Sequence, residues 1–210
     1  MKKIFVVLVA LATFATYAFA EGDKNQKRLD GEIGQGDTQQ ERITNPNNGV
    51  LPLAQLDEEQ KATIYAIYEE EKLARDIYRT LGNVYPEENT FANIQFSEQA
   101  HMDAVKNLCE RYDINIIVSD ETGVFTIIEP YNFQGFYNDV YITFVEEKTG
   151  SLLEALEIGR EIEVMDSEDL ELLLSLDFPL DVKQVFTNLL NGSYSHLDAF
   201  EKAIFRETSQ

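Results

Sequence analysis

The sequence is poor in several residue types, and their scarcity narrows the choice of function. Its 210 residues include no tryptophan, two histidines and a single cysteine, Cys109. One cysteine excludes both an intramolecular disulfide and a zinc site built from several thiolates. We expect Cys109 to be a free thiol buried on a helix, where it packs as a small apolar residue. No glycine-rich loop of the kind that cradles phosphate groups is present, so nucleotide chemistry is not indicated.

Positive charge is also scarce. The chain has 17 lysine and arginine residues against 38 aspartate and glutamate residues, which gives a formal net charge of -21 at pH 7. A field of this sign repels nucleic acids and anionic membranes and concentrates cations near the protein. Metal ions are therefore the expected partners, and nucleic acid is not. Most of these carboxylates serve solubility, and the sequence leaves open whether the chain forms a homodimer.

Long apolar runs are missing after the first twenty residues, so we expect no membrane-spanning helix there. Lys2 and Lys3 precede an apolar run that ends in Ala18-Phe19-Ala20. A basic start, an apolar middle and small residues at the cleavage position predict a secretory signal peptide over residues 1–20. An uncleaved anchor is the alternative, but the run is short for a bilayer span. The predicted product is exported, periplasmic or secreted, with no stable membrane anchor after cleavage.

The next segment, residues 21–50, is rich in Gly, Asn, Gln, Asp and Lys and contains almost no apolar side chains. Such a composition does not compensate for the entropy lost on ordering, so we predict a flexible polar linker. Residues 51–210 are then predicted to form one domain, for which their number is adequate.

Four stretches of this predicted domain have apolar residues at alternating steps of three and four, the pattern of amphipathic helices. The four stripes span residues 64–81, 91–112, 152–173 and 182–203. Three of them follow an N-cap residue that has Gln or Glu three positions later, which is a helix-start signal. These signals are Asp57-x-x-Gln60, Ser151-x-x-Glu154 and Asp181-x-x-Gln184, while Gly82 and Pro86 mark the end of the first helix.

A less regular stretch, about residues 113–150, separates the second helix from the third. Its second half, residues 133–147, is predicted to form a shorter helix. Two hairpins of long helices joined by one long connection are typical of a four-helix bundle with a crossover. The predicted fold class is therefore an all-α four-helix bundle with a long crossover between the second and third long helices.

Ionisable residues interrupt all four stripes at positions where the periodicity requires a core side chain. Burying an unpaired carboxylate is costly, so such residues occur inside a protein mainly with a partner. Both histidines are among them, and a metal ion is a partner that carboxylates and imidazoles share. The candidate metal ligands are Glu71, Glu98, His101, Glu163, Asp166 and His196, with Glu70 replacing Glu71 if the register is off by one.

The spacing of these residues supports a shared site. Glu98 and His101 are three residues apart and lie on one helix face. Ferritin-like helices use this Glu-x-x-His spacing to present a bridging carboxylate and an imidazole to a dinuclear metal site. A turn near Tyr85-Pro86 places Glu71 at the same depth as this pair. In the second hairpin the depths differ by about one helical turn, which a distortion at Gly192 would absorb.

Two segments, Glu69–Tyr78 and Ser97–Val105, resemble a family of prokaryotic ferritin-like proteins that is known only as a domain of unknown function. Later segments, among them Ser195–Phe200, resemble it too, and the resemblance covers about residues 55–206. More distantly, the spacing of Glu71 and Tyr78 is similar to that in the rubrerythrins. The resemblance implies a ferritin-like bundle whose metal ligands are Glu71, Glu98, His101, Glu163 and His196.

The last helix departs from the rubrerythrin pattern. Rubrerythrins repeat Glu-x-x-His there, whereas this chain has Ser193 three residues before His196. Asp166, one turn from Glu163, is the candidate to supply the missing carboxylate. A site for one metal ion, or for none, is the alternative.

Three functions remain open from the sequence. The first is an exported di-iron or di-manganese oxidoreductase that reacts with oxygen or peroxide, and iron is the metal that the resemblance favours. The second is a module that binds iron, manganese or zinc without turnover. The third is a degenerate bundle that kept the fold and serves as an interaction domain. Three tyrosines near the site are redox neighbours in the first hypothesis and packing residues in the others: Tyr65, Tyr68 and Tyr78.

Overall fold

The computed structural model describes residues 54–116 and 150–209 of the chain. These residues form four α-helices and no strand. The helices are α2 (Glu58–Val84), α3 (Asn89–Arg111), α5 (Leu152–Ser175) and α6 (Leu180–Thr208). The prediction of an all-helical domain is therefore confirmed for the described residues. The predicted signal peptide, the predicted linker and the predicted helix at 133–147 lie outside them.

Two of the predicted helix starts are present. At the start of α2, Asp57 Oδ1 accepts a hydrogen bond from the Gln60 amide at 2.8 Å, and Gln60 Oε1 accepts one from the Asp57 amide at 3.0 Å. At the start of α5, Ser151 Oγ accepts from the Glu154 amide at 3.2 Å. In both helices the side chain satisfies an amide that has no partner within the helix.

The prediction that Asp181 caps the last helix is wrong. The helix α6 begins two residues earlier than a cap at Asp181 would place it, at Leu180, and Pro179 precedes it without a side-chain cap. Asp181 lies in the first turn, where its two carboxylate oxygens share one hydrogen bond from the Tyr112 hydroxyl, at 2.8 and 2.9 Å. The same carboxylate lies 3.1 Å from Arg111 Nε. Asp181 therefore joins the start of α6 to the end of α3 instead of capping its own helix.

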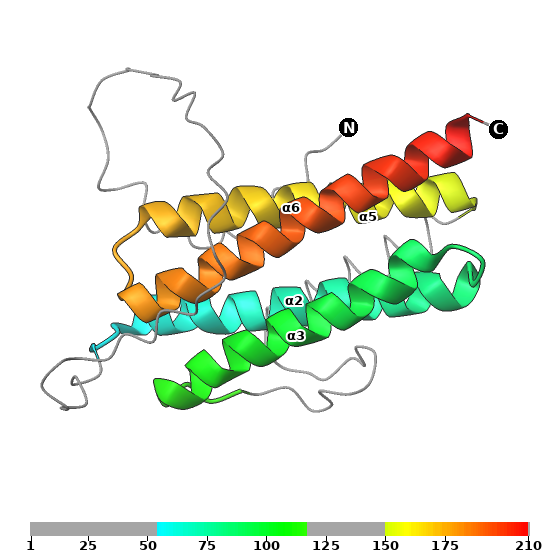
Figure 1. Ribbon diagram of the computed structural model, residues 1–210. Coiled ribbons are helices and arrows are strands. Elements are labelled where there is room, and N and C mark those ends of the chain that lie inside the picture. Colours follow the sequence, from blue (N-terminus) through cyan, green and yellow to red (C-terminus); the bar gives the residue numbers. More distant parts are fainter. Residues whose placement is uncertain (1–53, 117–149, 210) are drawn as a thin grey trace, which may run out of the picture. The chain divides into compact units, whose positions relative to one another are not determined.

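The four helices pack as a bundle. The helix α2 packs on α3 and α5 packs on α6, and contacts of α3 with α6 and of α2 with α5 bring the two hairpins together. Figure 1 shows that α3 and α5 run in the same direction, so α3 ends at the opposite end of the bundle from the start of α5. This arrangement requires the predicted long connection between the second and third helices. None of the described helices is long and apolar enough to cross a membrane.

An aromatic layer fills the bundle beside the polar centre. The Phe200 ring lies 5.2 Å from the Tyr78 ring and 5.7 Å from the Phe91 ring, measured between centroids. A Cβ atom on residue 159 would come within 2.3 Å of Phe200, so glycine at position 159 allows this ring to press against α5. All three aromatic rings are fully buried. Cys109 is a buried free thiol on α3, as the sequence predicted.

The depth offset in the second hairpin has a simple cause. From the end of α5 to Glu163 the helix rises about 18 Å, whereas from the start of α6 to His196 it rises about 24 Å. Residues 176–179 between the helices are not helical, and Leu176 and Pro179 have extended ψ angles of 167° and 152°. This link carries the chain about one helical turn farther along the bundle before α6 begins. No break at Gly192 is needed to absorb the offset, because α6 is continuous through that residue.

Candidate metal centre

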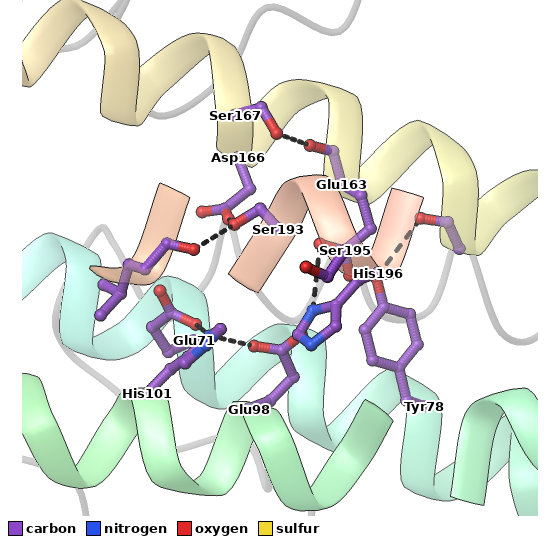
Figure 2. A network of polar contacts seen from close by, with 12 residues as sticks. Glu71, Tyr78, Glu98, His101, Glu163, Asp166, Ser167, Ser193, Ser195 and His196 are labelled. Carbon is purple, nitrogen blue, oxygen red and sulfur yellow. Dashed lines mark hydrogen bonds and ion pairs between the residues drawn. The ribbon is translucent and has the colours of Figure 1, made fainter. Parts of the chain in front are cut away.

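Glu98 occupies the middle of a buried polar cluster between the four helices (Figure 2). Its Oε2 atom lies 2.9 Å from Nδ1 of His101, one turn along α3. Its Oε1 atom lies 2.8 Å from Nδ1 of His196 on α6. The two imidazole rings are 5.4 Å apart between centroids. One carboxylate therefore turns a different oxygen atom toward each histidine.

On the His101 side of Glu98, the second carboxylate is Glu71 from α2. Its Oε2 atom lies 3.2 Å from Nδ1 of His101, while its Oε1 atom is buried and has no hydrogen-bond partner. The opposite edge of the His101 ring faces α6 at Gly192. A Cβ atom there would lie 2.4 Å from both Cε1 and Nε2 of His101. The absence of a side chain at position 192 therefore makes room for the imidazole.

On the His196 side, the second carboxylate is Glu163 from α5. Its Oε2 atom lies 3.4 Å from Nδ1 of His196. Its Oε1 atom accepts a hydrogen bond of 2.6 Å from the hydroxyl of Tyr78. His196 Nδ1 is near two carboxylates but is aligned for a hydrogen bond with neither. Tyr78 thus fixes one oxygen of Glu163 and leaves the other turned toward the imidazole.

Asp166 lies one turn along α5 from Glu163 and interacts with α6. The Ser193 hydroxyl is hydrogen-bonded to Asp166 Oδ2 and also lies 3.0 Å from the Leu189 carbonyl oxygen. The other carboxylate oxygen, Asp166 Oδ1, is buried without a hydrogen-bond partner. In Figure 2 the Asp166 and Ser193 side chains lie on the same side of the cluster as Glu71 and His101.

The carboxylates and histidines perturb one another strongly. Burial and the charge of Glu98 raise the pKa of Glu163 to about 8, and burial raises the pKa of Asp166 to about 7 despite its bond with Ser193. Burial and the charge of Asp166 raise the pKa of Glu71. Burial acts in the same direction on Glu98, but the two histidines outweigh it and lower the pKa of Glu98 to about 2.

Burial disfavours the charged forms of the two histidines, but the carboxylates around them have the larger effect. The hydrogen bonds and charges of Glu71 and Glu98 raise the pKa of His101 to about 11. Glu163 and Glu98 raise the pKa of His196 to about 9. Without a cation, the cluster therefore holds protons on both imidazoles and on part of its carboxylates at neutral pH. These are the protons that a metal ion displaces from its ligands.

The donor set fits divalent transition metal ions. Four buried carboxylates and two imidazoles are available, which is the ligand chemistry that iron, manganese and zinc share. Ligand atoms from Glu98, His101 and His196 all lie within 4.8 Å of one another. Glu71 Oε1 and Asp166 Oδ1 are orphaned, that is, buried without a hydrogen-bond partner. Their burial costs free energy, and a bound cation would remove this cost. Two divalent ions would balance the charge of four carboxylates.

The structure brings all six sequence-predicted ligands together at one place in the bundle. Glu70 remains beside the cluster: burial and the charges of Asp166 and Asp169 raise its pKa, and its Oε2 atom is buried without a hydrogen-bond partner. The sequence reasoning missed the roles of Gly192 and Ser193, and it treated Tyr78 as a general neighbour. The sequence did contain a signal for two of these residues. Ser193 is one turn from His196, and Tyr78 lies on the same helix stripe as Glu71, so both could have been expected to face the site.

The sequence profile of a family described as "Uncharacterized protein domain (DUF2202)" matches residues 59–209, which include all four helices except the first residue of α2. This chain belongs to the DUF2202 family. Uncharacterized protein MJ0754 of Methanocaldococcus jannaschii is 39% identical over 155 residues, covering 73% of this chain and 80% of that protein. The DUF2202 domain therefore includes every residue of the candidate centre.

A solved structure has the same fold as this DUF2202 chain. The crystal structure of hypothetical protein MJ0754 matches it with a TM-score of 0.68 and 37% sequence identity. The match covers 76% of this chain and 87% of that one.

Proposed function

We propose that this protein holds two divalent transition metal ions in a ferritin-like helical bundle, with Glu98 as the carboxylate between them. Three features support the ferritin-like assignment: the parallel direction of α3 and α5, the Glu-x-x-His spacing on α3, and ligands contributed by all four helices. The six proposed ligands are Glu71, Glu98, His101, Glu163, Asp166 and His196.

The observation that carries the proposal is the orientation of Glu98. A carboxylate that bridges two cations presents a different oxygen to each of them. Glu98 turns Oε2 to His101 and Oε1 to His196. Each histidine also has a second carboxylate, Glu71 or Glu163, within 3.4 Å. This divides the cluster into two sets, each with an imidazole, its own carboxylate and one oxygen of Glu98.

The metal that this donor set and the sequence resemblance favour is iron, with manganese or zinc as the alternatives. Bound iron would supply the electrons for a reaction with oxygen or peroxide, which makes the protein an oxidoreductase. The residues themselves hold the ions, orient the ligands and exclude water. The Tyr78 hydroxyl donates a hydrogen bond to Glu163 Oε1 and so leaves Oε2 as the oxygen that would bind the metal ion.

Export belongs to the same proposal. The pattern of residues 1–20 predicts a cleaved signal peptide, so the metal centre would work in the periplasm or outside the cell. The measurement is the mass of the protein recovered from its native compartment. A mass that corresponds to a start at Glu21 supports export, and an intact Met1 start contradicts it.

The proposed function is tested with Fe²⁺ added anaerobically to the metal-free protein, followed by exposure to air. We expect two Fe²⁺ ions to bind per chain, and an absorption band of oxidised iron to develop when oxygen is consumed. Glu98→Ala should lose most of the bound iron while its far-UV circular dichroism stays helical. Iron that binds without consuming oxygen would indicate a module without turnover. Absence of iron, manganese and zinc binding would contradict the metal centre and favour an interaction domain.

A further inference from the structure

The centre is not symmetric about Glu98, although each histidine has a carboxylate partner of its own. Glu163 has its spare oxygen engaged by Tyr78, and no orphaned carboxylate oxygen lies on the His196 side of the described cluster. Among the proposed ligands, the His101 side has two orphaned carboxylate oxygens, Glu71 Oε1 and Asp166 Oδ1. Both belong to side chains that are at least nine-tenths buried. Buried acceptors without a partner point to a ligand that is itself positively charged.

The side of the cluster to which Asp166 belongs follows from its neighbours. Its hydrogen-bond partner Ser193 is next in sequence to Gly192, which lies against the edge of the His101 ring. Figure 2 places Asp166 and Ser193 near Glu71 and His101, while Tyr78 lies with Glu163 and His196.

Two small residues on α6 create this arrangement. Gly192 leaves room for the imidazole of His101, and Ser193 is short enough to leave room for the carboxylate of Asp166. The Ser193 hydroxyl has a single proton, which it can donate either to the Leu189 carbonyl or to Asp166. When Asp166 is ionised, as a metal ligand is, its negative charge draws that proton. Ser193 then holds Oδ2 and leaves Oδ1 for the cation.

We propose that the centre has two unequal cation positions, and that Asp166, held by Ser193, makes the position beside His101 the stronger one. The proposal rests on the proposed function. The stronger position has Glu71, Asp166, His101 and one oxygen of Glu98, whereas the weaker one has Glu163, His196 and the other oxygen. The stronger position therefore has one more carboxylate. The first metal ion binds beside His101 and the second beside His196.

The test is a calorimetric titration of the metal-free protein with Zn²⁺, which is stable in air and has no redox chemistry to confuse the readout. We expect two binding steps whose dissociation constants differ by at least about tenfold, because an additional carboxylate near a buried cation is a large effect. Asp166→Asn should weaken the stronger step at least about tenfold, and Ser193→Ala should weaken the same step by a smaller factor. His196→Ala should remove the weaker step and leave the stronger one.

Matched variants separate this role from a general effect of charge or of helix stability. Glu161→Gln removes an exposed carboxylate from the same helix, and Ser195→Ala removes a hydroxyl from α6 that bonds only the Asn191 carbonyl among the described contacts. Each should change both steps by less than about threefold. If Asp166→Asn loses its helical circular dichroism, Ser193→Ala and His196→Ala decide the assignment, because they act on opposite steps.

The outcomes distinguish this inference from the function on which it rests. Two equal steps in the wild type, or an Asp166→Asn variant that affects only the weaker step, would overturn the inequality and leave the metal centre intact. Loss of the stronger step in His196→Ala would overturn the order of binding. A wild type that binds no Zn²⁺, Fe²⁺ or Mn²⁺ would overturn both.

Discussion

Two clusters of buried charge involve residues of α2, and they differ in how well their charged groups are paired. In the first, Asp76 accepts hydrogen bonds from Lys72 Nζ at 2.6 Å and from Arg75 Nε and Nη2 at 3.0 and 2.7 Å. Arg75 Nη1 also donates to Gln99 Oε1 at 2.6 Å. In the second, the candidate metal centre, four carboxylates share two imidazoles and two carboxylate oxygens have no partner.

Burial does not distinguish the two clusters, but the pairing of their charged groups does. Lys72, Arg75 and Asp76 are as deeply buried as Glu71 and Glu98, so burial alone does not mark a site. In the first cluster, which we call the Asp76 cluster, both cations are hydrogen-bonded to the Asp76 carboxylate, and both of its oxygens have partners. The metal centre has an excess of negative charge that only protons or cations can balance. The unpaired carboxylate oxygens of the candidate metal centre are therefore the feature that indicates a bound cation.

The largest expected effect comes from breaking the Asp76 cluster. Asp76→Ala leaves two buried cations without their carboxylate, and we expect a loss of about 3–5 kcal/mol in the free energy of unfolding. Urea denaturation measures this loss. Asp103→Asn is the control, because this exposed carboxylate on α3 accepts a hydrogen bond from the Gln99 side chain and should change stability by less than about 0.5 kcal/mol. A small effect of Asp76→Ala would show that the cluster is not tightly matched.

The next effect is the response to metal, which should be confined to the second cluster. Zn²⁺ at a hundredfold excess over its dissociation constant should stabilise the wild type by about 2.7 kcal/mol for one site. Glu98→Gln should gain little, because it removes the shared ligand. Asp103→Asn should gain as much as the wild type. Thermal melts with and without Zn²⁺ give the difference, and an equal gain in Glu98→Gln would contradict the assignment.

The third effect is the pH dependence of the metal-free protein. Burial raises the pKa of Glu163 to about 8 and that of Asp166 to about 7, so the folded chain binds more protons than the unfolded chain above about pH 4. The stability that these groups contribute is complete below about pH 4 and is lost as the pH rises through 7 and 8. The raised pKa values of His101 and His196 act in the same direction up to higher pH.

Neutralising one carboxylate sharpens this prediction. Metal-free Glu163→Gln should be more stable than the wild type at pH 8 and should lose less stability between pH 5 and pH 8. Glu161→Gln changes the same charge at an exposed position on the same helix and should keep the wild-type slope. Urea midpoints at each pH, in the presence of a chelator, measure the two slopes. Parallel curves for the two variants would mean that Glu163 is not part of a buried carboxylate cluster.

The smallest expected effect concerns the hydrogen bond that holds Glu163. Tyr78→Phe removes the hydroxyl and should cost about 0.5–1.5 kcal/mol of stability in the metal-free protein. The control is Tyr194→Phe, which removes a similar tyrosine–glutamate bond at an exposed site, to Glu171. Urea denaturation should show a smaller cost for the control. Equal costs would indicate that the Tyr78 bond contributes no more than a surface contact.

Much of this centre could be predicted from the sequence, because periodicity identifies polar residues at core positions. Glu71, Glu98 and His101 lie on regular stripes in a hairpin with a short turn, so their depth follows from counting residues. The second hairpin was less predictable. Counting assumed a compact turn near Phe178, whereas the link at residues 176–179 is extended and displaces α6 by about one turn.

Other features could not be predicted, since they depend on contacts between helices. The capping signal at Asp181 was a correct local pattern, but Tyr112 and Arg111 from the end of α3 engage that carboxylate. Periodicity also gave no reason for Gly192 or Ser193. Their roles appear only when His101 from α3 and Asp166 from α5 are placed against α6.

The central claim is that the unmatched carboxylates of the second cluster hold two metal ions, one on each side of Glu98. Anomalous X-ray diffraction from crystals of the protein grown with Mn²⁺ or Fe²⁺ tests this most directly. We predict two anomalous peaks inside the bundle, one beside His101 and one beside His196, with Glu98 between them. Peaks only at surface carboxylates, or no peak among these residues at a saturating metal concentration, would contradict the account.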